Sequence, residues 1–414
     1  MKPKLLTTLT DYTPRLFLGD ALAGITVALV ALPLSIAIAI ASGAPPSTGP
    51  ITAIIAGFLI SALGGSRVQI GGPTGAFIVV VYDVIHQHGY EGLLTSTMMA
   101  GAILLAAALL RIGRLIRHVP DPVIEGFTIG IAVVIAASQI RDLAGLDTGP
   151  LAADFLPKLA QLWAARQTVH GAALGLGIAT ITALLLLRRF APKLPAMPII
   201  VALGSAIAVL FLPGIETVTS RYGALPGGLP MPELPQFSVS SALELLPSAI
   251  TIAFLAGIES LLSAKVADNM IGASHRSDAE LLAQGAANLA SPLFGGLPAT
   301  GALARTAANV NAGGRTPVAG IVHAVAILLA IIFAAGLVGA LALPALAGLL
   351  VATAWNMSEP HRWRERMHLP PAELGLLALT AVLTIFADLT IAIAAGTAIG
   401  LAMQRTRQFS TPGG

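Results

Sequence analysis

Long apolar runs alternate with short clusters of glycine, proline and charged residues along almost the whole chain. A helix that crosses a hydrocarbon core of about 30 Å needs roughly 20 apolar residues, and most of the runs approach that length. The pattern predicts fourteen membrane segments, at about 20–42, 49–64, 73–86, 92–110, 119–140, 168–187, 196–212, 245–262, 278–293, 302–310, 316–340, 342–355, 371–387 and 388–404. The divisions at 341 and 388 are the least marked, because each splits a long apolar stretch.

Two of these segments, the third and the tenth, are too short to cross a bilayer. Each follows a stretch rich in glycine and proline, and the two share one tripeptide, Thr74-Gly75-Ala76 and Thr300-Gly301-Ala302. They lie seven spans apart, so the two halves of the chain have opposite orientations. Short, interrupted segments at matching positions of two halves indicate a transporter site. The alternative, that proline and glycine only kink two ordinary helices, explains neither the shared tripeptide nor the matching positions.

Each short segment is expected to begin near the bilayer midplane as a half-helix. A helix that begins there leaves its first N–H groups unpaired and partly positive. Two such ends that face each other form an anion site without any formal charge. The approaches to both half-helices are expected to be extended, and Gly71, Gly72, Gly75 and Gly301 allow a ligand or another backbone to come close.

Ionisable residues inside membrane segments are costly and are candidates for function by default. Glu259 lies deep in the eighth segment with Ser263 one turn later on the same face, and Arg305 lies about one turn into the tenth segment. Two interpretations stay open for the pair of charges. In one, Glu259 takes up a proton or another ion beside an anion site, where Arg305 adds positive field or holds Glu259. In the other, Glu259 and Arg305 form a purely structural ion pair between two helices.

The composition is typical of a membrane protein. Of the 414 residues, 56% are hydrophobic and only 10% are charged, whereas about a quarter of the residues of a soluble domain are charged. An ordinary soluble enzyme, a secreted disulfide scaffold and a disordered chain are therefore excluded. The chain has no cysteine, no pair of histidines at metal-ligand spacing on a span and no Walker A loop. We expect no metal, no cofactor, no direct use of ATP and no nucleic-acid partner.

The basic residues are distributed unevenly between the predicted loops. Eighteen of the 23 lysines and arginines fall at loops and ends that are cytoplasmic if the N-terminus is cytoplasmic, and Arg305 lies within a span. The other four fall at the opposite face, at Arg141, Lys158, Arg166 and Arg221. By the positive-inside rule, this asymmetry predicts an even number of spans with both termini in the cytoplasm.

Several motifs resemble those of the sulfate permease family (SulP, the SLC26 group). The first is DALAGITVALVALP at 20–33, and the approach GGPTGA at 71–76 is similar to that family's third span. The most specific motifs follow one another in the second half: ESLLSAKVAD at 259–268, ELLAQGAAN at 280–288, FGGLPATG at 294–301, RTAAN at 305–309 and GGRTP at 313–317. Together they extend over most of the chain, so a chance match is implausible.

The resemblance implies an all-α membrane protein of fourteen transmembrane segments in two inverted seven-span repeats, the UraA/SLC26-like 7+7 fold. After a cytoplasmic N-terminal segment at 1–19, the transport domain is expected at 20–404. Its core would be formed by about 20–118 and 245–340, and its gate by about 119–244 and 341–404. The tail at 405–414 is expected to be cytoplasmic and to carry no STAS domain, although members usually have one. Members also commonly form homodimers.

The resemblance implies that substrate binds between the two half-helices and that the core moves against the gate like an elevator. Together with the glycine-rich approach and the intramembrane charges, it gives a predicted substrate-binding set: Leu34, Ile38, Gly72, Thr74, Glu259, Ser263, Ala302, Leu303, Ala304 and Arg305. In this set Ala302, Leu303 and Ala304 would act through backbone N–H groups. Glu259 is also the predicted coupling-ion residue, and glutamate at that position favours coupling to protons.

The sequence therefore predicts a secondary active transporter of small anions in a bacterial inner membrane. We expect that it is not an enzyme. The substrate would be an inorganic oxyanion such as sulfate or bicarbonate, or a small dicarboxylate, taken up by proton symport. One alternative is a nucleobase-type proton symporter on the same fold, against which Arg305 counts. Another is an uncoupled anion channel. The expected partners are the anion, protons and membrane lipid.

Overall fold

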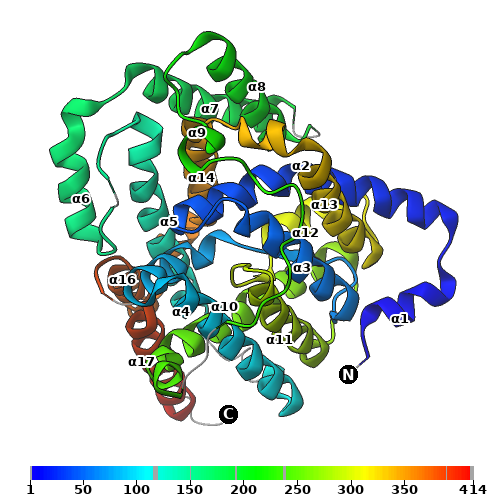
Figure 1. The fold of residues 1–414 in the computed structure, drawn as a ribbon. Coiled ribbons are helices and arrows are strands. Elements are labelled where there is room, and N and C mark those ends of the chain that lie inside the picture. The colour runs from blue at the N-terminus through cyan, green and yellow to red at the C-terminus, as the bar shows by residue number, and fades with distance from the viewer. Residues whose placement is uncertain are drawn as a thin grey trace.

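The computed structural model describes residues 2–114, 120–149, 151–191, 194–235, 239–387 and 389–410. Within them the chain is a bundle of helices (Figure 1), with one very short pair of strands. The elements are α1 (Lys4–Thr8), η1 (Leu9–Asp11), α2 (Pro14–Ala41), α3 (Thr48–Leu63), β1 (Gly71–Gly72), η2 (Gly75–Phe77), α4 (Ile78–Leu109), η3 (Ile112–Arg114), α5 (Asp121–Ala144), α6 (Phe155–Ala164), η5 (Ala165–Thr168), α7 (Gly171–Phe190), α8 (Ala196–Phe211), α9 (Val218–Tyr222), α10 (Val239–Ile271), α11 (Ser277–Leu293), β2 (Thr300–Gly301), α12 (Leu303–Asn311), α13 (Val318–Gly339), α14 (Leu343–Met357), η6 (Pro360–Arg362), α15 (Trp363–Met367), α16 (Pro371–Phe386) and α17 (Leu389–Ser410).

Each predicted segment coincides with a helix or with part of one. The third and fourth segments form one element, α4, which is interrupted at Gly89, where φ is 71°. The eighth segment is longer than predicted, because α10 continues to Ile271. The predicted divisions at 118–119 and at 388 lie outside the described residues, as does the tail from 411 onward.

Six helices of the described residues are long and apolar enough to cross a membrane by themselves. They are Pro14–Ala41, Gly75–Leu109, Asp121–Ala144, Gly171–Phe190, Ser241–Ile271 and Val318–Gly339. Shorter apolar helices include Thr48–Leu63, Ala196–Phe211 and Pro371–Phe386. The chain is thus a helical membrane protein, and the count of fourteen spans stays a prediction.

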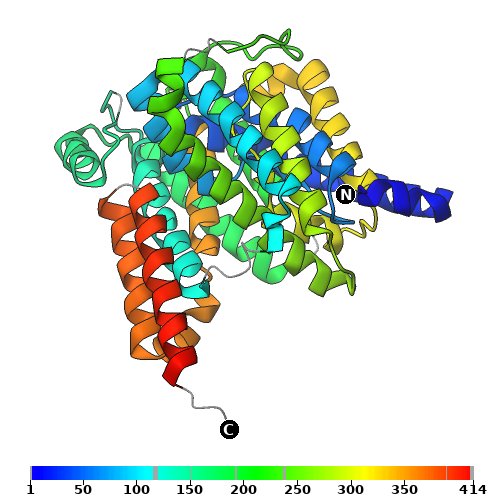
Figure 2. The same ribbon diagram turned by 90° about the horizontal axis from the view of Figure 1, so that it is seen from below.

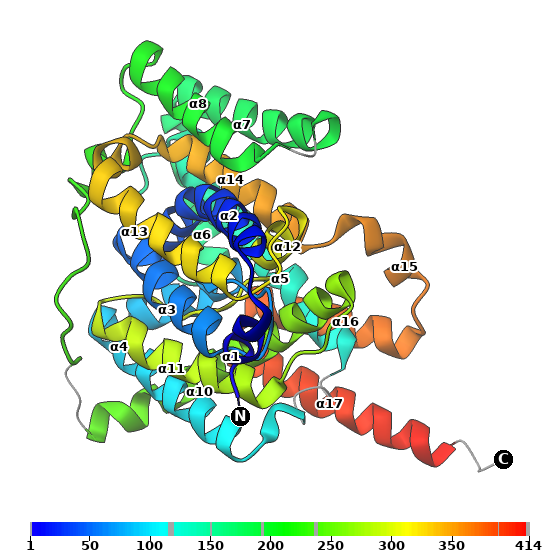
Figure 3. The same ribbon diagram turned by 90° about the vertical axis from the view of Figure 1, so that its right-hand side faces the viewer.

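The two halves of the chain interleave in two packed groups of helices. In the first group α11 packs along α4 and α3, α13 packs along α2 and α3, and α10 packs along α4. In the second group α14 packs against α5 and α7, and α16 packs against α5 and α17. Figure 2 shows α16 and α17 side by side at one edge, and Figure 3 shows α7 and α8 together at another. Each group therefore contains helices from both halves.

The first and second halves also meet in the strand pair. β1 and β2 are antiparallel, with Gly71 opposite Gly301 and Gly72 opposite Thr300, and all four residues are buried. The approaches to both half-helices are therefore extended, as predicted. Extended backbone inside a membrane protein must find hydrogen-bond partners within the protein, and each approach supplies them to the other.

Asp20 fixes the beginning of α2 to the turn between α12 and α13. Its Oδ1 accepts the N–H groups of Arg315 (2.7 Å) and Thr316 (3.1 Å), and its Oδ2 accepts the hydroxyls of Thr316 (2.5 Å) and Tyr12 (3.0 Å). Burial, and after it the negative charge of Asp20, raises the pKa of Tyr12 to about 12. Tyr12 therefore keeps its proton at neutral pH and remains a donor to this buried carboxylate.

Candidate functional site

The first half-helix begins immediately after the strand pair. Thr74 precedes η2 in an extended conformation (φ −125°, ψ 158°), and η2 continues into α4. No side chain caps this end, and Phe77 N–H donates to the Thr74 carbonyl at 3.2 Å, so the N–H groups open to a ligand in the first turn are those of Gly75 and Ala76. Gly75 and Ala76 are partly exposed, whereas Gly72 is buried. The N-terminus of this helix is therefore partly exposed, on the side that faces the second group of helices.

The second half-helix, α12, begins at Leu303 and also has no side-chain cap. Leu303 is 40% exposed and Ala304 is exposed, so the first turn is accessible here too. Ala302 differs from both, because its N–H donates to the carbonyl of Ile70 at 2.9 Å. That N–H is occupied within the protein, and the backbone donors open to a ligand in this set are those of Leu303 and Ala304.

Glu259 lies on α10 beside the first half-helix. Its side chain is partly exposed, and its Oε2 accepts a 2.9 Å hydrogen bond from the Thr74 hydroxyl. Ser263, one turn later, is fully buried and donates to Thr306 Oγ1 at 3.3 Å. Thr306 Oγ1 in turn accepts the N–H of Ile70 at 3.1 Å. Glu259 is therefore open to the site, whereas Ser263 connects α10 to α12 behind it.

Arg305 is almost completely buried, with 2% of its surface exposed. Its Nη2 donates to Ser35 Oγ (3.1 Å) on α2 and to the carbonyl of Pro73 (3.0 Å). A Cβ atom on Gly72 would lie only 2.2 Å from Nη1, so glycine at this position makes room for the guanidinium. The positive charge of Arg305 thus lies directly behind the approach to the first half-helix.

Glu259 and Arg305 form no ion pair. The salt bridges among the described residues do not include one between them, and each has a different partner, Thr74 for Glu259 and Ser35 with Pro73 for Arg305. The interpretation as a purely structural ion pair is therefore wrong for this conformation. The physical reason is that both side chains find nearer partners in the first half of the chain.

The two predicted residues of the first segment are apolar and buried. Leu34 and Ile38 are 6% and 2% exposed and belong to the same apolar cluster as Phe77, Ile78 and Ile135. They pack around the first half-helix and offer no polar group. Between them on α2 lies Ser35, the Arg305 partner that the sequence analysis missed. The signal available in the sequence was the polar residue Ser35, which lies two positions after Pro33 within an apolar run.

Gly75 faces the second group of helices. A Cβ atom placed on it would lie 3.1 Å from Met357 Sδ on α14 and 3.6 Å from Ile135 Cδ1 on α5. The first half-helix therefore begins at the boundary between the two packed groups. Substrate bound at its N-terminus would lie at that boundary as well.

Two broken helical segments from the two halves of the chain meet at a buried strand pair, and a carboxylate and a guanidinium lie next to them. This arrangement defines a membrane transporter with a central site. The chain belongs to the Sulfate permease family, whose sequence pattern matches residues 17–380. It is accordingly a transporter rather than an enzyme.

Two relatives are similar over most of the chain. YvdB of Bacillus subtilis, which its name assigns provisionally to sulfate transport, is 41% identical over 386 residues, covering 93% of this chain and 73% of YvdB. The bicarbonate transporter BicA of Picosynechococcus is 28% identical over 388 residues, covering 91% of this chain and 68% of BicA.

Solved structures agree with this fold. The transmembrane domain of a cyanobacterial bicarbonate transporter BicA superimposes with a TM-score of 0.82 at 28% identity, covering 93% of this chain and 98% of that domain. Murine Slc26a9, described as an anion transporter in the inward-facing state, gives a TM-score of 0.87 at 16% identity, covering 97% of this chain and 71% of that chain. The second likeness shows the fold alone.

Proposed function

We propose that this protein is a secondary active transporter of small anions that carries an inorganic oxyanion such as sulfate or bicarbonate, or a small dicarboxylate, together with a proton. The observation that carries the proposal is the pair of uncapped helix N-termini, at Thr74 and at Ala302. The names of two relatives support the substrate class, because YvdB is named for sulfate and BicA for bicarbonate.

The charges near the site favour a negative ligand. Each helix N-terminus carries the equivalent of roughly half a positive charge, and Arg305 adds a full one from behind Gly72. Glu259 opposes them whenever it is ionised. A proton on Glu259 removes that repulsion, so proton binding and anion binding assist each other, and the assistance is reciprocal. This reciprocity is the physical basis that we propose for symport.

The position of Gly75 supports an elevator mechanism. In the proposal, the core formed by about 20–118 and 245–340 moves against the gate and carries the site with it. Gly75 belongs to that core, whereas Ile135 and Met357, which it faces, belong to the gate. The motion would therefore change the surroundings of the first half-helix without breaking the strand pair. We place the protein in a bacterial inner membrane, with both termini cytoplasmic and as a homodimer.

Uptake into proteoliposomes tests the proposed substrate and its coupling. Labelled sulfate, bicarbonate, chloride and dicarboxylates are offered with and without a pH gradient, and uracil serves as the probe for the nucleobase alternative. We expect accumulation of at least one oxyanion or dicarboxylate that depends on an acidic exterior. Uptake of uracil without any anion rejects the proposal, and anion flux that no gradient can drive uphill supports a channel. Full gradient-driven accumulation by Glu259→Gln rejects the role of Glu259 in coupling.

A reversible cross-link tests the elevator motion. Because the chain contains no cysteine, Gly75→Cys with Met357→Cys introduces one pair without removing others. Oxidation should stop uptake, and a reductant should restore it, whereas each single variant should be insensitive to both. Uptake that continues through an oxidised, cross-linked pair contradicts motion between these two surfaces.

A further inference from the structure

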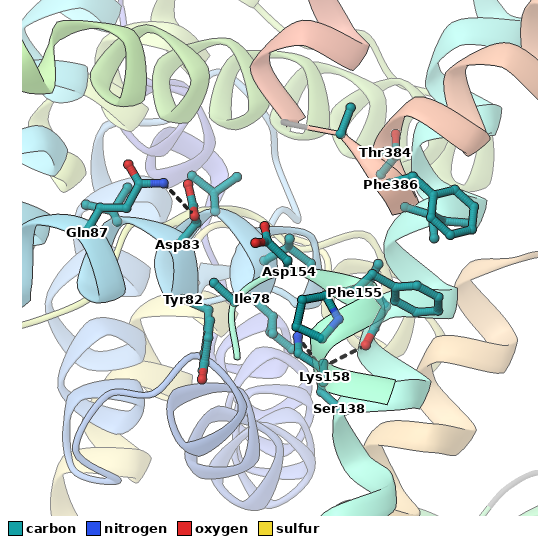
Figure 4. Close-up of a pocket in the computed structure, with 18 of the residues that line it drawn as sticks. Ile78, Tyr82, Asp83, Gln87, Ser138, Asp154, Phe155, Lys158, Thr384 and Phe386 are labelled. Carbon is teal, nitrogen blue, oxygen red and sulfur yellow. Dashed lines mark hydrogen bonds between the residues drawn. The ribbon is translucent and has the colours of Figure 1, made fainter. Parts of the chain in front are cut away.

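A cavity of about 400 Å³ extends along the first half-helix, away from the strand pair (Figure 4). Ile78 at the beginning of α4 and Gln87 about two and a half turns later both line it, as does Thr251 on α10. Ile78 is four residues beyond Thr74, and Thr251 lies eight residues before Glu259, or about 12 Å along the helix. The cavity therefore begins near the candidate site and leads toward residues 153–158, which the charge distribution places at the non-cytoplasmic face.

The cavity contains one basic side chain among the described residues that line it, Lys158 of α6. This side chain is buried, since Lys158 is 4% exposed. Its Nζ donates to Ser138 Oγ at 3.3 Å and lies 5.2 Å from the centre of the Tyr82 ring. Figure 4 shows Lys158 pointing toward Ser138 on α5. The ammonium is thus held between the first half-helix and a helix of the second group.

The hydrogen bonds of this ammonium are incomplete. An ammonium has three N–H donors, and Lys158 uses one of them in a long bond to a neutral hydroxyl. None of the salt bridges among the described residues includes Lys158. Carboxylates line the same cavity, but none is within ion-pair distance of Nζ, and a buried ammonium without a direct ion pair is incompletely compensated. The remaining donors would be satisfied by an anion in the cavity beside them.

The neighbours of Lys158 position it and do not compete as donors to the anion. Ser138 donates its own proton to the carbonyl of Val134 at 2.8 Å, so toward Lys158 it acts as an acceptor. Tyr82 donates to the carbonyl of Leu151 at 2.5 Å, which holds the segment before α6 against α4. Ser138 and Tyr82 are therefore positioning residues.

Two carboxylates limit what the cavity can accept. Asp83 and Asp154 line it together with Lys158, and Asp83 accepts a 2.8 Å hydrogen bond from Gln87 Nε2. Their negative charges support the ammonium but repel an anionic ligand, and this repulsion increases with the charge of the ligand. One ammonium against this background favours an anion with a single charge. The cavity volume is sufficient for a small one with bound water.

We propose that Lys158 forms an outer station, a binding site for a small monovalent anion such as bicarbonate on the path between the non-cytoplasmic face and the half-helix site. The inference rests on the proposed function, since it adds a second site to the path of the transported anion. Lys158 is the ligand of the anion, and Ser138 positions its ammonium. The station raises the local concentration of the anion before it reaches Thr74 and Leu303.

The test compares uptake kinetics from the two sides of the membrane. Lys158→Gln should raise the KM for external labelled bicarbonate about tenfold and leave the maximal rate and the KM from the inside unchanged. Lys158→Arg should retain most of the wild-type affinity, and Ser138→Ala should raise the external KM about threefold. Arg166→Gln is the matched control, because Arg166 is exposed at the same predicted face and contacts Trp163 instead of the cavity. It should change neither KM.

Each outcome separates the station from the proposed function. If the wild type takes up anions but Lys158→Gln leaves the external KM unchanged, or changes both KM values equally, the station is rejected and the proposed function stands. Uptake of sulfate without bicarbonate also rejects a monovalent station and leaves anion transport intact. If the wild type takes up no anion, the proposed function is rejected, and the station with it. Should Lys158→Gln fail to fold, Ser138→Ala carries the test, and an external KM that it leaves unchanged rejects the station.

Discussion

The Thr74 hydroxyl donates a 2.9 Å hydrogen bond to Glu259 Oε2 and so joins the beginning of the first half-helix to α10. Threonine in this position commonly caps the helix that it precedes, yet here no side chain caps the helix. One hydrogen bond therefore has two effects. It orients the carboxylate, and it leaves the helix end open to a ligand.

Removing the Thr74 hydroxyl should disturb the orientation of the Glu259 carboxylate and leave the helix end open. Thr74→Val keeps the shape of the side chain but leaves Glu259 without this donor, and a hydrogen bond to a charged group contributes about 1.5–3 kcal/mol. We expect uptake of the transported anion to fall about tenfold or more, while Thr74→Ser retains most of it. The measurement is initial uptake into proteoliposomes at matched protein content. Equal uptake by the valine and serine variants would show that the hydroxyl has no part in transport.

Arg305 should be required for its charge more than for its packing. Arg305→Gln removes the positive charge behind Gly72, and we expect the KM for the transported anion to rise about tenfold. Ser35→Ala removes a neutral partner of the same guanidinium and should change the KM no more than about threefold, since the Pro73 carbonyl remains. An unaltered KM in a folded Arg305→Gln protein would reduce Arg305 to a structural residue.

Glycine is required where the two approaches meet. A Cβ atom on Gly301 would lie 1.4 Å from Gln69 Nε2, so the buried Gln69 side chain must move and give up its hydrogen bonds to Ser260. We expect Gly301→Ala to lose uptake and to lower the melting temperature in detergent. Gly375→Ala is the control, because Gly375 lies in α16 with nothing within 4 Å of a new Cβ, and it should stabilise the helix by about 0.5–1 kcal/mol. A normal Gly301→Ala transporter would contradict the close approach.

The elements were predictable from the sequence because membrane helices are specified locally. Apolar length gave the positions of the segments, and glycine and proline marked both half-helices. The extended approaches followed from Gly71, Gly72 and Gly301, since an interrupted helix at that depth must have its backbone satisfied by protein. These inferences need no knowledge of which helices are neighbours.

The partners of the site residues were not predictable in this way. Arg305 bonds to Ser35, which is 270 residues away in the chain, and Ala302 gives its N–H to Ile70. Such contacts depend on how two distant segments pack, and no local pattern encodes that. For the same reason Lys158 was counted only as a charge at the non-cytoplasmic face, although its side chain is buried in a cavity.

A charge network in the second group of helices should stabilise the fold. Glu125 on α5 accepts from Arg362 (2.7 Å) and Arg366 (2.9 Å), and the Arg366 side chain is only 8% exposed. Glu125→Gln leaves this arginine with Glu359 as its remaining carboxylate partner, and we expect a loss of about 1–3 kcal/mol in unfolding free energy. The control is Glu365→Gln, whose carboxylate is 77% exposed and 3.7 Å from Arg362, so its loss should cost less than about 0.5 kcal/mol. Thermal unfolding in detergent measures both, and equal shifts would contradict the burial argument.

The outer station should lose its affinity as the pH rises. Burial lowers the pKa of Lys158, although the charge of Asp154, the residue before α6, partly opposes this. The groups that face Lys158 from the other elements are Asp83 and Tyr82 on α4 and Ser138 on α5. A lowered pKa means that the ammonium loses its proton at a lower pH than an exposed lysine does. External chloride, which does not titrate in this range, should therefore inhibit uptake less well as the pH rises. In Lys158→Arg the inhibition by chloride should not change with pH, because a guanidinium keeps its proton. The same alkaline decline in the wild type and in Lys158→Arg would assign the pH dependence to another group.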